Sequence, residues 1–124
     1  MSRVLIAEDE DSMRTLVAPA LAMDGHATVT AEDGAEALEI LIRENGAFDL
    51  LLTDIKMPVM DGIALALTVA RDFPDLTILL MTGFADQRER AHGLNAIVHD
   101  VVTKPFSVAD IRTAVADALA AKKG

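Results

Sequence analysis

The chain has 124 residues, of which 52% are hydrophobic and 25% are charged. This length and composition suit one globular domain with its own core, and they exclude a disordered tail. The formal net charge of −9 disfavours contact with nucleic acid or an anionic membrane, because both require clustered Lys and Arg. There is no Cys, so disulfides and thiolate metal sites are excluded.

The amino-terminal sequence MSRVLIAEDED contains only a short apolar run before its acidic residues. That run is too short for the core of a signal peptide. Nowhere do about 18 apolar residues follow one another, as a membrane-spanning helix requires. The sequence therefore predicts an untargeted protein of the cytoplasm.

Short apolar runs alternate with segments of helical length. The runs are 4–7, 27–31, 49–53, 77–81 and 96–102. The first, third and fourth consist almost entirely of Val, Ile and Leu, which is typical of parallel strands covered on both faces. The second alternates small and β-branched residues, which favours an edge strand. This order predicts an α/β fold with a five-stranded parallel sheet and helices on both faces.

Two of the intervening segments begin with a capping-box pattern. Asp33 and Glu36 precede one apolar helical stripe, and Ser107 and Asp110 precede the last one. In such a box the first side chain accepts a hydrogen bond from an early backbone N–H, and the acidic side chain accepts one in return. Helices are therefore expected to start at both places.

The other helical segments carry weaker signals. Residues 13–24 show helical spacing of apolar residues, but Pro19 removes one backbone donor there, so we expect a kink or a broken turn. Residues 63–72 follow Asp61, which we expect to cap a helix and not to bind metal. Residues 86–92 are almost wholly polar and form the least convincing helix.

Polar residues follow four of the five apolar runs. They are Glu8 and Asp9, then Asp54, Thr82 and Lys104. The carboxyl ends of parallel strands meet at one edge of the sheet, so these residues should converge there. Asp54, at the junction between strand and loop, is expected to present an exposed carboxylate on a rigid support.

The converging residue types indicate one kind of chemistry. Three neighbouring carboxylates repel one another unless a cation lies among them, and oxygen ligands without Cys or His favour Mg²⁺ over Zn²⁺. A carboxylate can act as a nucleophile toward phosphorus and form an aspartyl phosphate. A lysine ammonium and a threonine hydroxyl can hold the oxygens of the transferred group.

With these residues, the chain resembles the receiver domains of response regulators, the phosphoacceptor modules of two-component signalling. The resemblance covers essentially the whole chain. It is carried by Glu8-Asp9, by Asp54 with Met57-Pro58 and Asp61-Gly62, by Thr82, and by Lys104-Pro105-Phe106, in family order and spacing.

The resemblance implies a flavodoxin-like fold with strand order 2-1-3-4-5 and a cis peptide bond before Pro105. It implies that Asp54 is phosphorylated by a histidine kinase or a phosphotransfer protein, in a phosphorylation-activated switch that assists its own phosphorylation and dephosphorylation. In the family, Mg²⁺ is bound directly by the residues matching Asp9, Asp54 and the Lys56 carbonyl, and through water by the one matching Glu8. Thr82 and Lys104 match the residues that hold the phosphoryl oxygens.

The sequence departs from the family pattern near its last strand. Receivers usually have an aromatic residue three positions before the lysine, where this chain has Val101. The usual Gly-Ala-Asp-Asp is replaced by residues 97–100, IVHD, which predicts a longer and more apolar last strand. Phe84 is the nearest aromatic residue that could take over the readout role.

The resemblance also bears on organisation and output. We expect residues 1–124 to form a single receiver domain without an output domain, as a monomer or weak dimer that acts through an unknown downstream protein. The segments AEDEDSMR and LLLTDIKMPVMDG are similar to stand-alone regulators of bacterial cell-cycle proteolysis. A regulator of the chemotaxis type is an alternative.

Two other classes of protein were weighed against this interpretation. A Mg²⁺-dependent phosphohydrolase of the haloacid-dehalogenase type would also form an aspartyl phosphate, but it usually needs a second Asp where this chain has Lys56. An interaction module that keeps only the fold has no need of the intact set of acids, threonine and lysine.

Overall fold

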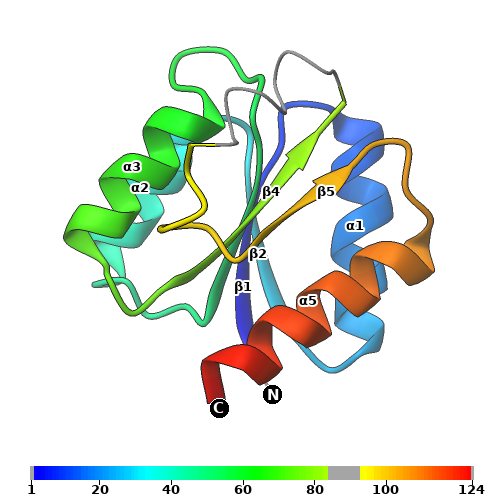
Figure 1. Ribbon diagram of the computed structural model, residues 1–124. Coiled ribbons are helices and arrows are strands. Elements are labelled where there is room, and N and C mark those ends of the chain that lie inside the picture. Colours follow the sequence, from blue (N-terminus) through cyan, green and yellow to red (C-terminus); the bar gives the residue numbers. More distant parts are fainter. Residues whose placement is uncertain (1, 84–92, 124) are drawn as a thin grey trace.

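The computed structural model describes residues 2–83 and 93–123. The strands β1 (Arg3–Ala7), β2 (Ala27–Ala31), β3 (Leu50–Asp54), β4 (Thr77–Thr82) and β5 (Asp100–Thr103) form one sheet. All four pairings are parallel, and the strand order is β2-β1-β3-β4-β5 (Figure 1). The predicted α/β fold, its strand order and the edge position of β2 are confirmed.

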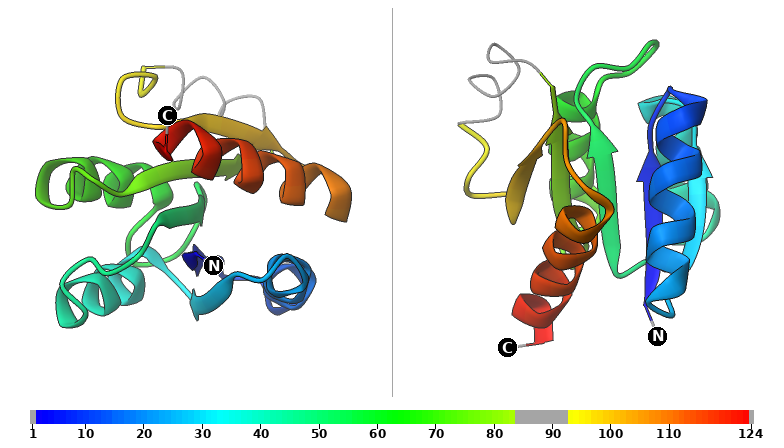
Figure 2. Two further views of the ribbon diagram at one scale, coloured as in Figure 1. Left: turned by 90° about the horizontal axis from the view of Figure 1, so that it is seen from below. Right: turned by 90° about the vertical axis from the view of Figure 1, so that its right-hand side faces the viewer.

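Helices cover both faces of the sheet. They are α1 (Asp11–Met23), α2 (Gly34–Arg43), α3 (Gly62–Asp72) and α5 (Val108–Lys123). Figures 1 and 2 show α2 and α3 on one side of the sheet and α1 and α5 on the other. Connecting helices must run back along the faces of a parallel sheet, so each strand begins at the same edge.

Side chains of the central strands alternate between two hydrophobic clusters. In β1 and β3, Leu5 and Leu51 contribute to the cluster that includes α2 and α3. Their neighbours Val4 and Leu50 contribute to the cluster that includes α1 and α5. All four side chains are fully buried, so both faces of these strands need apolar residues, and the sequence of each strand is a continuous apolar run.

Both predicted capping patterns cap a helix, but among the described hydrogen bonds only the pattern at α5 is a reciprocal box, because at α2 the Glu36 carboxylate accepts a hydrogen bond of 3.2 Å from the Glu32 N–H. The Asp33 side chain accepts a hydrogen bond of 2.8 Å from the Glu36 N–H at the start of α2. Ser107 Oγ accepts from the Asp110 N–H at 3.0 Å, and the Asp110 carboxylate accepts from the Ser107 N–H at 3.1 Å. These bonds satisfy backbone donors that have no partner within the helix.

The prediction for the first helix was wrong about its start and about a broken turn at Pro19. α1 begins at Asp11 instead of residue 13, and it continues past Pro19 without a broken turn. Pro19 and Thr15, whose carbonyl loses its helical donor, both lie on the exposed face of α1. Solvent can satisfy that carbonyl, so the helix tolerates the proline.

The last strand was also predicted incorrectly. β5 comprises only residues 100–103, so it is shorter than the predicted run 96–102. Its residues are half-buried or exposed, so it is not the apolar strand that was predicted. The backbone N–H groups of Ile97 and Val98 both bond to the Leu94 carbonyl, so this segment turns and buries Val98 without sheet pairing. The helix predicted over 86–92 lies outside the described residues.

Candidate functional site

Asp54 is the last residue of β3, at the carboxyl edge of the sheet. It pairs in register with Met81 on β4, and Thr82 is the next residue along that strand. The side chain of Asp54 is only 8% exposed, so the expectation of an exposed carboxylate was wrong. Its Oδ1 accepts a hydrogen bond of 2.9 Å from the Ile55 N–H, which fixes the orientation of the carboxylate.

The loop after Asp54 folds back tightly onto the strand. The Gly62 N–H donates to the Ile55 carbonyl at 2.8 Å. A Cβ at position 62 would lie 1.9 Å from the Asp54 carbonyl oxygen, so only glycine fits there. Asp61 accepts a hydrogen bond of 2.8 Å from the Ala64 N–H, which confirms its prediction as the cap of α3.

Three carboxylates converge at this edge. Glu8 and Asp9 follow β1 and Asp54 ends β3, and each has a carboxylate oxygen within 4.8 Å of the others'. Glu8 is fully buried, whereas Asp9 is exposed. Lys104 Nζ donates to Glu8 Oε1 at 2.9 Å and to Asp54 Oδ2 at 3.2 Å. The lysine therefore joins two of the acids from the opposite end of the sequence.

Burial and charge perturb this group of residues. Burial raises the pKa of Glu8 to about 7, against the lowering effect of the Lys104 hydrogen bond; the Asp54 charge adds to the increase. Burial by itself would lower the pKa of Lys104, but the hydrogen bond that it donates to Glu8 and the charge of Asp54 raise it overall. The ammonium group therefore stays charged at neutral pH, and burial makes Glu8 a weaker acid than an exposed glutamate.

Thr82 and Lys104 lie on neighbouring parts of the same edge. Thr82 ends β4 and is fully buried, and its carbonyl accepts a hydrogen bond of 2.7 Å from the Lys104 N–H. The Lys104–Pro105 peptide bond is cis, as the resemblance implied. The structure thus brings every predicted site residue to one edge.

A cavity of about 860 Å³ opens beside these groups. Its walls include polar residues of the site and apolar residues from the surrounding loops: Asp9, Glu10, Met13, Asp54, Lys56, Met57, Pro58, Gly83, Lys104 and Pro105. The residue two positions after Asp54 is Lys56, which is exposed at this cavity, so the second Asp that a phosphohydrolase of the haloacid-dehalogenase type usually needs is not there. The space suits a small anionic group that contacts the acids, their lysine and a cation together.

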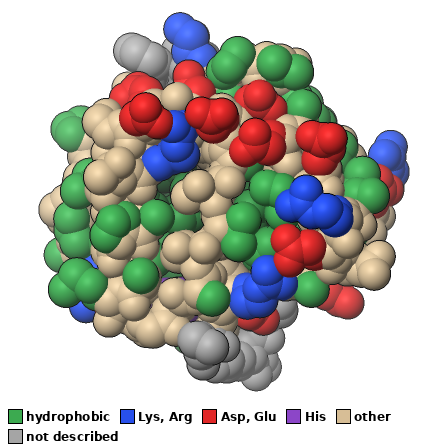
Figure 3. Space-filling model, turned by 180° about the vertical axis from the view of Figure 1, so that it is seen from behind, with side chains coloured by type: hydrophobic (Ala, Val, Ile, Leu, Met, Phe, Trp, Pro, Cys, Tyr) green, Lys and Arg blue, Asp and Glu red, His purple; other side chains and the backbone are tan. Residues whose placement is uncertain are grey.

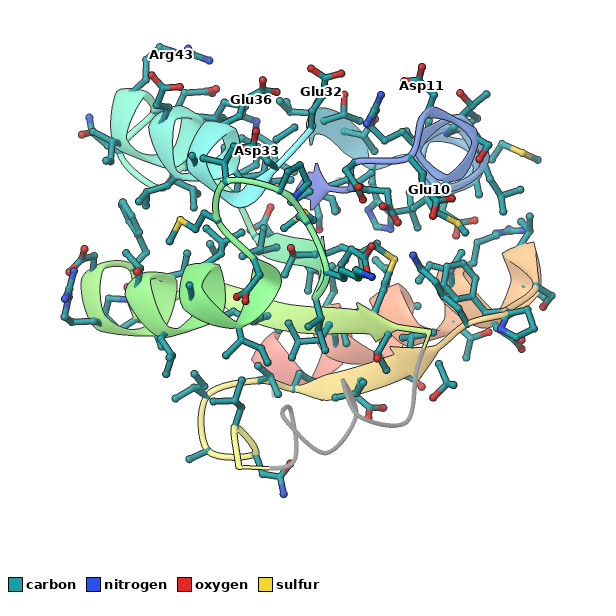
Figure 4. The ribbon with its side chains drawn as sticks, turned by 90° about the horizontal axis from the view of Figure 1, so that it is seen from above. Glu10, Asp11, Glu32, Asp33, Glu36 and Arg43 are labelled. Atoms are coloured by element: carbon teal, nitrogen blue, oxygen red, sulfur yellow. The ribbon has the colours of Figure 1, made fainter. Side chains whose placement is uncertain are left out.

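Further acidic side chains lie near the three carboxylates of the site. Figure 3 shows acidic side chains gathered along one edge of the molecule, and Figure 4 shows Glu10 and Asp11 at the start of α1, with Glu32 between them and α2. Among them lies Arg14, with a side chain only 13% exposed. Sequence reasoning missed Arg14; its spacing of three residues from Asp11, on the helix next to the acidic pair, was the available signal.

Val101 stands half-buried on β5, paired in register with Leu80. It packs against the cluster of α2 and α3. The position that carries a ring in most receivers therefore holds a short aliphatic side chain. Phe84, predicted as its substitute, lies outside the described residues.

A model of the response regulator receiver domain family matches residues 4–116. The chain therefore belongs to this family, and it is a phosphorylation-activated switch of two-component signalling. Among the described residues, no helix is long and apolar enough to cross a membrane.

Relatives of different length share this domain. The chain is 40% identical over 111 residues to the response regulator receiver protein CpdR of Brucella abortus, covering 90% of this chain and 91% of that protein. This similarity supports the predicted cell-cycle subgroup. The chain is also 35% identical over 113 residues to a probable transcriptional regulator, ycf27, of Guillardia theta, covering 91% of this chain and 43% of that protein.

Solved structures agree with the fold. A CheY-like receiver domain protein from Methanospirillum hungatei superposes with a TM-score of 0.89 at 26% identity, over 99% of this chain and 97% of that one. The response regulator TrrA from Thermotoga maritima, solved in complex with Mg(2+)-BeF, superposes with a TM-score of 0.83 at 29% identity, over 94% and 98% of the two chains.

Proposed function

We propose that Asp54 accepts the phosphoryl group, from a histidine kinase or a histidine phosphotransfer protein. A carboxylate oxygen of Asp54 forms a bond to phosphorus while the bond from phosphorus to the donor nitrogen breaks, and the product is an aspartyl phosphate. The observation that carries this proposal is the convergence of three carboxylates beside Lys104 at an open cavity.

The surrounding residues have distinct roles in this proposal. The Ile55 N–H holds Asp54 Oδ1, so the carboxylate is oriented before the donor arrives. Lys104, already 3.2 Å from Oδ2, neutralises an oxygen of the incoming group. Thr82 donates its hydroxyl to another oxygen, because it ends the strand next to Asp54.

The acids also fit a divalent cation. We propose that Asp9, Asp54 and the Lys56 carbonyl bind Mg²⁺ directly, and that Glu8 contributes through water. Carboxylate and carbonyl oxygens are the ligands that Mg²⁺ prefers, and three acids within 4.8 Å need a counter-charge. When bound, Mg²⁺ supplies neutralisation of the charge on the transferred group. The solved complex of the similar TrrA with Mg(2+)-BeF supports this assignment.

Signal output is proposed to run through protein–protein contacts with a downstream protein. The chain's net charge of −9 is unfavourable for binding nucleic acid. Because Val101 replaces the usual ring, output must use a conformational change other than a rotating aromatic side chain at this position.

Intact-mass spectrometry after incubation with acetyl phosphate and Mg²⁺ tests the proposal. The expected result is a gain of one phosphoryl group that hydroxylamine removes, because hydroxylamine cleaves acyl phosphates. The Asp54→Asn variant should show no adduct, and Lys104→Ala should show much slower formation. A small phosphodonor is suitable because it isolates the acceptor chemistry from recognition of a kinase.

A matched variant separates the acceptor from the other acids. Asp9→Asn keeps the nucleophile and should form adduct only at raised Mg²⁺ concentration. A wild-type protein that gains no phosphoryl mass would contradict the proposal. An adduct that persists in Asp54→Asn would show that another residue is the acceptor.

A further inference from the structure

Arg14 is a mostly buried arginine at the edge of the acidic group. It lies in the second turn of α1, and its side chain is 13% exposed. Its Nη1 donates to the Glu8 backbone carbonyl at 2.5 Å. Its Nη2 pairs with Asp11 on the same helix and, at 3.5 Å, with Glu32 in the loop before α2.

The peptide group that joins Glu8 to Asp9 is therefore fixed by α1. In the preceding peptide group, the Glu8 N–H donates to the Ala31 carbonyl of β2 at 3.0 Å. The backbone of Glu8 is thus held by two elements, one through its N–H and one through its carbonyl. Both of the acids that β1 contributes to the site start from this fixed segment.

The pairs with Asp11 and Glu32 do not explain why the guanidinium is buried. Those carboxylates are 92% and 70% exposed, as expected for acids on the surface of α1 and its neighbouring loop (Figure 4). Ion pairs of such exposed groups are screened by solvent and weak. The short bond to the Glu8 carbonyl is shielded, and a charged donor strengthens it.

We propose that Arg14 is a positioning residue for the divalent cation site. It holds the Glu8–Asp9 backbone so that the carboxylates of both residues lie close to the Asp54 carboxylate. Without this support, repulsion between the three negative charges would drive the carboxylates apart. Arg14 contacts no reacting atom, and it acts through the backbone of Glu8. This inference rests on the proposed Mg²⁺ site.

The charge of Arg14 and its positioning role have opposite effects on the affinity of the site for Mg²⁺. A guanidinium near the site repels Mg²⁺, so if Arg14 contributed charge alone, its removal would tighten binding. If it positions the acids, its removal weakens binding. Loss of residues that orient metal ligands typically lowers metal affinity about 10- to 100-fold.

Isothermal titration of the unphosphorylated full chain with MgCl₂ distinguishes these cases. We expect Arg14→Ala to raise the Kd for Mg²⁺ by roughly tenfold. Arg71→Ala is the matched control, because Arg71 pairs with the adjacent Asp72 on the exposed end of α3 and its loss changes the net charge equally. The control should leave the Kd unchanged. An unchanged or lower Kd for Arg14→Ala overturns the inference.

A second variant keeps the test decisive if Arg14→Ala does not fold, as judged by circular dichroism. Arg14→Lys retains the charge but lacks the planar group that reaches the Glu8 carbonyl and Glu32 together. It should raise the Kd for Mg²⁺ several-fold, and an unchanged Kd overturns the inference. Asp9→Asn separates the two proposals: Mg²⁺ binding that is absent in wild type, or unaffected by Asp9→Asn, contradicts the metal site itself rather than the role of Arg14.

Discussion

At the amino end of the sheet, charged side chains meet partners of opposite sign, whereas at the carboxyl end three carboxylates crowd together beside Lys104. Arg3 illustrates the amino end: its guanidinium pairs with Glu44 at 2.7 Å, donates to the Ala47 carbonyl at 2.6 Å and lies 4.3 Å from the centre of the Phe48 ring. Charge at this end stabilises the fold.

The backbone differs between the ends in the same way. The turns at the amino end that need positive φ use residues that tolerate it, such as Gly25 and Asn45-Gly46. The loop after Asp54 places Val59 at φ 67°, which is unfavourable for a β-branched residue. Strain and like charges therefore concentrate where the chemistry takes place, as expected for a functional site supported by a stable framework.

Removal of Lys104 should have the largest effect on stability. Lys104→Ala leaves the fully buried Glu8 without its cationic partner, so we expect a loss of about 3 kcal/mol in the free energy of unfolding. Urea unfolding in Mg²⁺-free buffer measures this loss of stability. Arg43→Ala, which removes an exposed basic side chain from the last turn of α2, should stay within about 0.5 kcal/mol of wild type. A loss below about 1 kcal/mol for Lys104→Ala would contradict the prediction.

Removal of Arg3 should cost less, because its partners are partly solvated. Arg3→Ala loses the Glu44 pair, the Ala47 hydrogen bond and the contact with Phe48, and we expect about 1 to 2 kcal/mol in urea unfolding. The backbone bond from the Arg3 N–H to Asp49 remains in the variant. A larger loss than that of Lys104→Ala would reverse the comparison between the two ends.

Exchange of residue types between the ends tests the backbone difference. Val59 is 85% exposed, so Val59→Asn sacrifices little burial and should raise stability by about 1 kcal/mol through relief of the positive φ. Asn45→Val, at φ 53° after α2, should lower stability by about 1 to 2 kcal/mol. Both changes can be followed by thermal and urea unfolding. If both variants raised stability, or both lowered it, backbone φ would not be the cause of the change in the free energy of unfolding.

The smallest effect is expected at the contact between α1 and α5. Hydrogen bonds from Arg112 lower the pKa of Asp24 below its usual 3.8. A carboxyl whose pKa is lowered by folding adds stability above its unfolded pKa and loses it as the pH falls through the folded value. Arg112→Ala should therefore lower the Tm at pH 7, and the difference from wild type should vanish in acid. A difference independent of pH would exclude this ion pair as its source.

Much of the fold follows from local patterns in the sequence. The runs of Val, Ile and Leu predicted buried parallel strands, because both faces of such strands are covered. Capping residues predicted the starts of α2 and α5. The prediction for residues 96–102 failed because apolar residues can be buried in a turn as well as in a strand: Val98 is in the core without sheet pairing.

The members of the site were also identifiable from the sequence, but their environment was not. Asp54 and Glu8 are buried, and Lys104 bonds to both over separations of 50 and 96 residues. Burial and distances between side chains depend on how loops close over the sheet edge. Gly62, for example, brings the following loop against the Asp54 carbonyl.

The sequence by itself determined the alternation of strands and helices, the residue types at the carboxyl ends and the family to which they belong. Only the tertiary structure decided which charges share a site: it buries Glu8 against Lys104, orients Asp54 through the Ile55 N–H and brings Arg14 to the Glu8 carbonyl. Residue type limits the chemistry that a group can perform, but pKa, orientation and charge balance depend on neighbours distant in the sequence.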